Sequence, residues 1–78
     1  MKTVDEIMAE EFANPLARLS REYKAGFRAG LEWRINGKEP FFPYPSATAR
    51  ADAFFFGLID GHKIWRLQMI KAEKGNGQ

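Results

Sequence analysis

Residues 23–31 read YKAGFRAGL, and residues 53–61 read AFFFGLIDG. Each stretch holds two glycines four positions apart, which are Gly26 and Gly30 in the first and Gly57 and Gly61 in the second. Residues four apart lie on one face of an α-helix, and each glycine inside a helix costs about 1 kcal/mol against alanine. Four such glycines need a packing reason, so the pattern predicts two helices that cross with their backbones close together. The alternative is that a ligand or an RNA backbone approaches these glycines.

The first glycine pair lies within the clearest helical period of the chain. Large and mainly apolar residues recur there at spacings of three and four, namely Leu16, Leu19, Tyr23, Phe27 and Leu31. Asn14 and Pro15 precede the period, and they form a start signal because Asn caps helices well and Pro fits the first helical position. Gly37 suits a left-handed helix end. We therefore expect a helix over residues 14–36.

Two more helices and a linker complete the expected organisation. Thr3 and Glu6 form a capping box, which predicts a short helix within residues 1–13. Ser46 or Thr48 can cap a last helix over residues 47–74, which carries the second glycine pair. The intervening residues 37–46 hold three prolines, which favour an extended linker. The tail, residues 75–78, should be frayed.

These elements predict a single all-α domain. It should consist of a short N-terminal helix and two long antiparallel helices that are joined by the linker rich in proline and aromatic residues. Exposure of all three linker rings would be costly, so we expect some of them to fold back onto the helices. The rings are Phe41, Phe42 and Tyr44.

The composition excludes several classes of function. With 78 residues the chain has room for one domain, and it has no cysteine and a single histidine, His62. Disulfides, thiolate nucleophiles, cysteine zinc sites and multi-histidine metal sites are excluded, and we expect no cofactor and no catalytic residue. The longest apolar run, residues 53–59, is too short to span a membrane, and the N-terminus lacks a signal-peptide pattern. The absence of disulfides in so small a chain favours a cytoplasmic location.

Basic residues are the most suggestive side chains, although the net charge is only +2. Arg21, Lys24 and Arg28 share one helix face by their spacing, and Lys63 and Arg66 lie on the last helix. Aromatic residues are interleaved with them, and this combination suits phosphate contact with base stacking. The alternative is two helix faces that are simply solvated.

Four short motifs resemble the ribosome modulation factor family and its small relatives. They are residues 26–30 (GFRAG), 43–45 (PYP), 53–57 (AFFFG) and 65–66 (WR), and the resemblance covers roughly residues 23–66. It implies two helices joined by a linker, and binding to the ribosome or ribosomal RNA. By motif position it implies contacts from Arg28, Tyr44 and Arg66, with Lys24 and Lys63 supporting them through phosphates.

A protein–protein interaction module is the alternative function, with no nucleic-acid role. A small inhibitor or adaptor of the phage type, docking a host protein, would have this size and lack of catalytic groups. A continuous positive face over both long helices would favour RNA, whereas a bare aromatic patch would favour a protein partner.

Self-association is a further expectation. The last helix carries more apolar residues than one neighbouring helix can cover, because consecutive residues point about 100° apart. We expect a homodimer with Phe55, Ile59 and Trp65 near its seam. The rival is a monomer in which the linker rings and the N-terminal helix cover this surface.

Overall fold

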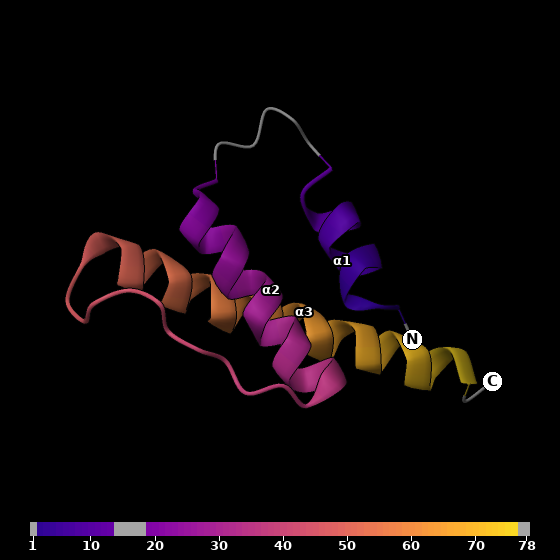
Figure 1. Ribbon diagram of the computed structural model, residues 1–78. Helices are drawn as coiled ribbons and strands as arrows, with labels where there is room; N and C mark the ends of the chain where they lie inside the picture. The colour runs from indigo at the N-terminus through magenta and orange to yellow at the C-terminus, as the bar shows by residue number, and fades with distance from the viewer. Residues whose placement is uncertain (1, 14–18, 77–78) are drawn as a thin grey trace.

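A computed structural model describes residues 2–13 and 19–76, with the side chains described up to residue 73. They form three helices: α1 (Val4–Glu11), α2 (Arg21–Asn36) and α3 (Ala49–Asn76) (Figure 1). No strand occurs in these residues, so the expected all-α class, with one short and two longer helices, is confirmed.

The start of α1 follows the capping box that the sequence indicates. The Thr3 hydroxyl accepts from the Glu6 amide at 3.2 Å, and the Glu6 carboxylate accepts from the Thr3 amide at 3.0 Å. The Thr3 amide, followed by the Thr3 hydroxyl, lowers the pKa of Glu6, because a hydrogen-bond donor beside the carboxylate favours its charged form.

The start of α2 differs from the expected one. Ser20 is extended, and its hydroxyl accepts from the Tyr23 amide at 3.0 Å, so the helix begins at Arg21. Leu19 and Ser20 are therefore not helical, and the expected start at Asn14 and Pro15 lies outside the described residues. Serine caps as well as asparagine does, which is why the later signal can begin the helix. The end at Gly37 is as expected, with a left-handed φ of 71°.

The bounds of α3 also shift. Of the two expected caps, Thr48 acts, because its hydroxyl accepts from the Ala51 amide at 3.1 Å. The helix continues to Asn76, so residues 75 and 76 belong to it rather than to a frayed tail. Residues 77–78 lie outside the described part.

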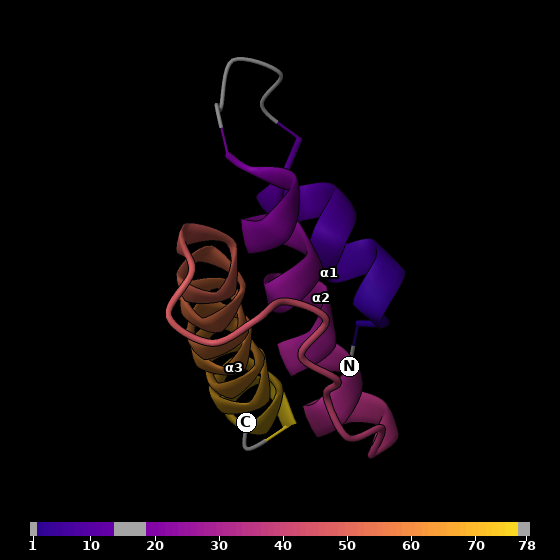
Figure 2. The same cartoon turned by 60° about the vertical axis from the view of Figure 1, so that its left-hand side comes forward.

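The two long helices cross in parallel, which corrects the antiparallel expectation. Gly26 faces the backbone of Phe54, and Gly30 faces that of Leu58, so residue numbers rise together along both helices. Both views show the linker returning along α2 before α3 starts (Figure 2). The linker is long enough to allow this return, because twelve residues separate Asn36 from Ala49. Extended, they reach up to about 40 Å, which exceeds the roughly 24 Å length of α2.

Helix α2 is the middle of three layers, with α1 on one side and α3 on the other (Figure 2). The buried apolar side chains lie on both of its flanks: Val4, Ile7, Phe27, Leu31, Phe54 and Leu58. Two linker rings fold back as expected, with Phe42 and Tyr44 at 5.3 and 5.9 Å from the Phe54 ring. Phe41 does not, since it remains 80% exposed.

Candidate functional site

The glycine crossing brings two backbones into direct contact. A Cβ added to Gly30 would lie 2.6 Å from the Leu58 carbonyl oxygen, and one on Gly57 would lie 2.8 Å from the Phe27 nitrogen. Gly26 and Gly61 face backbone carbonyls at least as closely. In each glycine a hydrogen occupies that direction, so it points at a main-chain carbonyl in the manner of a Cα–H···O contact. The glycines therefore pack helix against helix, and no space for a ligand remains there.

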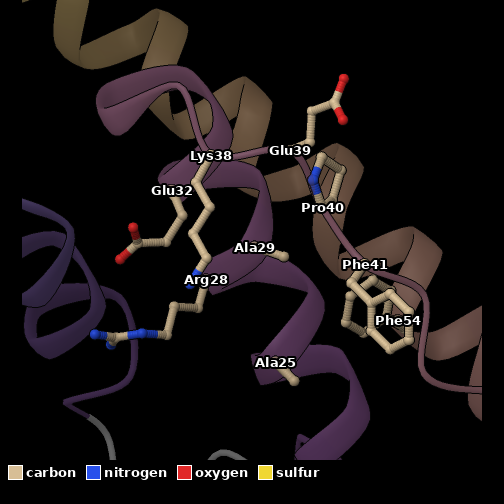
Figure 3. A pocket seen from close by; sticks show the side chains of 9 residues that line it. All are labelled: Ala25, Arg28, Ala29, Glu32, Lys38, Glu39, Pro40, Phe41 and Phe54. Carbon is tan, nitrogen blue, oxygen red and sulfur yellow. The ribbon is translucent and has the colours of Figure 1, made fainter.

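A groove lies between α2 and the linker that returns along it (Figure 3). The groove has a volume of about 280 Å³. Ala25 and Ala29 form its α2 side, Pro40 and Phe41 line it from the linker, and the buried ring of Phe54 lies behind. It exists because the two alanines, four apart on one helix face, carry the smallest side chains where the linker passes.

The positive and negative charges at the rim of the groove are equal in number. Arg28 and Lys38 are positive, and Glu32 and Glu39 are negative. The Arg28 guanidinium reaches away from the two phenyl rings (Figure 3) to the Asp5 carboxylate of α1 at 2.7 Å. The groove therefore suits an uncharged apolar group, with mixed polar contacts around it.

The five residues expected to contact RNA are not brought together. Two are engaged with α1 and the residue that follows it, because Arg28 pairs with Asp5 and the Lys24 ammonium lies 5.7 Å from the Phe12 ring. Tyr44, which lies in the linker, packs on Phe54 of α3. Lys63 and Arg66 are exposed on α3. The set thus occupies three separate places instead of one continuous face.

A second cluster, which the sequence did not indicate, surrounds Arg34 at the far end of the crossing. The Arg34 Nε donates to His62 Nδ1 at 2.9 Å, and the guanidinium lies 4.4 Å from the Trp33 ring and 5.6 Å from the Trp65 ring. Burial, followed by the positive charges of Arg34 and Arg66, lowers the pKa of His62. The neutral imidazole is therefore favoured, as its role as acceptor requires.

Trp65, one residue of the expected dimer seam, is part of this cluster. Trp65 is partly buried and packs against the core cluster that includes Phe27 and Leu31 of α2. Its ring centroid lies 5.7 Å from that of His62. Phe55 points away from this cluster and is half-exposed. Because the two residues are ten positions apart on one helix, their directions differ by roughly 80°.

Three titratable side chains at the crossing, Tyr23, Asp60 and His62, are held in two separate contacts. The Tyr23 hydroxyl donates to the Asp60 carboxylate across the crossing, while His62 is held by Arg34. Burial and this acidic partner raise the pKa of Tyr23 to about 12. Within residues 2–13 and 19–73, no three His, Asp or Glu side chains are grouped so that they could hold a metal ion.

The outer face of α3, the side turned away from α2, carries several exposed apolar residues. Phe56 is 59% exposed and Leu67 is 50% exposed, and Phe55 and Ile70 are exposed beside them. Lys63 and Arg66 lie among these apolar residues, and neither is in an ion pair with another described residue.

Comparison with protein-family models, curated proteins and solved structures found no match to this chain. Across the helices that the structure describes, none combines the length and the apolar character needed to cross a membrane.

Proposed function

We propose that this chain is a small non-enzymatic protein that binds another protein, whose apolar side chain enters the groove between α2 and the linker. The observation that carries this proposal is Phe41, a phenyl ring that is 80% exposed at the edge of an apolar cavity. Burying a side chain of this kind stabilises a complex by about 1.5–3 kcal/mol. Phe41 and the groove together offer the bare aromatic surface expected of a protein-binding module.

The groove's dimensions set the kind of occupant. Its volume of about 280 Å³ lies just below the range of roughly 300–1,000 Å³ that is typical of small-molecule sites. Anchoring side chains in protein interfaces fill pockets of this smaller kind, surrounded by polar contacts that exclude water. The balanced charges of Arg28, Lys38, Glu32 and Glu39 suit such a rim.

Filling the groove tests the proposal. Ala29→Leu should block entry, and Phe41→Ala should remove a wall, while Ala9→Leu makes the same change at an exposed position of α1 as a matched control. Tagged wild-type chain and the three variants would be used as baits in a lysate, followed by mass spectrometry. We expect the wild-type and Ala9→Leu baits to capture a partner protein that the Ala29→Leu and Phe41→Ala baits do not capture. Equal capture by all four baits would overturn it.

Binding to ribosomal RNA is the second function we propose, as the resemblance to ribosome modulation factors implies. One observation favours it: the Arg34 guanidinium, with no carboxylate partner among the described residues, lies close to the rings of both Trp33 and Trp65. Guanidinium beside indole suits phosphate contact with base stacking.

Co-sedimentation with ribosomes at low and moderate salt tests this second function. Association should weaken as salt rises, because each phosphate contact releases counterions. Arg34→Gln should reduce it, and Arg50→Gln, the same charge change at the other end of the crossing, should not. Absence of association at both salt concentrations would overturn the ribosomal role.

A further inference from the structure

The outer face of α3 carries a regular seam. Its members alternate in spacing between four and three residues: Asp52, Phe56, Ile59, Lys63, Arg66 and Ile70. This is the spacing with which one helix packs along another in a coiled coil. Helix α2 packs on the opposite side of α3, at Phe54, Gly57 and Gly61, and α1 lies beyond α2 (Figure 2), so neither helix covers the seam.

The order of charges along this seam indicates what covers it. A basic residue, Lys63, and an acidic residue, Asp52, are eleven positions apart, with the apolar Phe56 and Ile59 between them. If two copies of α3 pack antiparallel about a two-fold axis between residues 57 and 58, Asp52 meets Lys63 of the partner subunit. In the same register Phe56 meets the partner's Ile59, and the symmetry repeats both contacts.

We infer that the chain forms a two-fold antiparallel homodimer through the outer face of α3, with reciprocal Asp52–Lys63 ion pairs enclosing a Phe56–Ile59 centre. The inference goes beyond the proposed function. The groove beside Ala25 and Ala29 faces α2 and the linker, so it stays open in such a dimer.

Other arrangements of the same two surfaces fit less well. In a parallel pair each seam residue meets its own copy, so Lys63 opposes the partner's Lys63 and Asp52 opposes the partner's Asp52. An antiparallel pair shifted by seven residues places Asp52 against the partner's Ile70, and Lys63 against the partner's Ile59, which leaves the charges without opposite partners. Like charges and unpaired charges at a packed contact are both unfavourable.

Charge exchange tests the register. Sedimentation and light scattering from micromolar to millimolar concentration should show a mass that rises from 8.9 kDa to twice that value. Lys63→Asp should raise the dissociation constant by about tenfold or more, because two attractive pairs become repulsive. Asp52→Lys should do the same, and the double exchange should restore the wild-type constant. Arg21→Asp makes the same charge change at an exposed position of α2 and should leave association unchanged.

The outcomes separate this inference from its rivals. All substituted residues are exposed, and circular dichroism verifies that each variant keeps its helices. Restoration by the double exchange supports the Asp52–Lys63 register, since non-specific association would not recover. A mass of 8.9 kDa at every concentration, or a double exchange that stays dissociated, would overturn the dimer proposed here. Neither result bears on the groove, which the Ala29→Leu bait tests by itself.

Discussion

Adding one methyl group at the glycine crossing should destabilise the protein, although alanine favours helices. In Gly57→Ala the new Cβ would lie 2.8 Å from the Phe27 nitrogen and closer still to the Tyr23 carbonyl oxygen, whereas ordinary contact begins near 3.4 Å. The two helices must therefore separate by about 0.6 Å or more, which loosens contacts along the whole crossing. Overpacking of this kind costs about 1–3 kcal/mol, and helix propensity returns up to ~1 kcal/mol. We expect a net loss of about 1–2 kcal/mol in the free energy of unfolding.

Urea and thermal unfolding, followed by circular dichroism, measure this loss. For a chain of this size it corresponds to a fall in Tm of about 4–16 °C. Gly26→Ala should behave alike, and the double variant should cost less than the sum, because helices that have already separated accept the second methyl group more easily. Gly37→Ala provides the matched control, because nothing lies within 4 Å of its Cβ position. Its cost in stability comes from the left-handed φ of 71° alone, so it should add independently to the cost of Gly57→Ala. A Gly57→Ala protein as stable as wild type would refute the close crossing.

Three further predictions concern the ends and the polar contacts of the crossing. Ser20→Ala should remove the cap of α2 and lower stability by about 1 kcal/mol in urea unfolding, whereas an unchanged midpoint would place the helix start elsewhere. The fold favours the neutral form of His62, so the unfolded chain takes up a proton at a higher pH than the folded chain does. The free energy of unfolding should therefore fall as the pH drops below about 6.5, and level off below the lowered pKa of His62 in the folded chain. His62→Gln should abolish this pH dependence. Tyr23 should ionise near pH 12 in an absorbance titration, and the stability that its hydrogen bond contributes should be lost as the pH rises from about 10 to 12; ionisation near 10 would contradict its pairing with Asp60.

Local signals were sufficient for much of the fold. The capping box at Thr3, the left-handed end at Gly37 and the glycine spacing each depend on a few neighbouring residues, and each is found in the structure. The predicted start of α2 is wrong because two residues that cap helices well, Asn14 and Ser20, lie within seven positions of each other, and local preference does not choose between them. The Arg34 cluster was missed for a different reason: Trp33 and Trp65 are 32 residues apart, and only the crossing brings them to the same guanidinium.

The direction of the crossing could not be predicted, because four-residue glycine spacing allows close approach in either sense. That direction nevertheless decides where the candidate site lies. An antiparallel pair needs only a short loop at one end, and the outer side of α2 would then stay bare. A parallel pair requires the chain to travel back along α2, and this return places Pro40 and Phe41 beside Ala25 and Ala29. The groove is therefore a consequence of the parallel topology, with its depth set by the side chains at the two alanine positions.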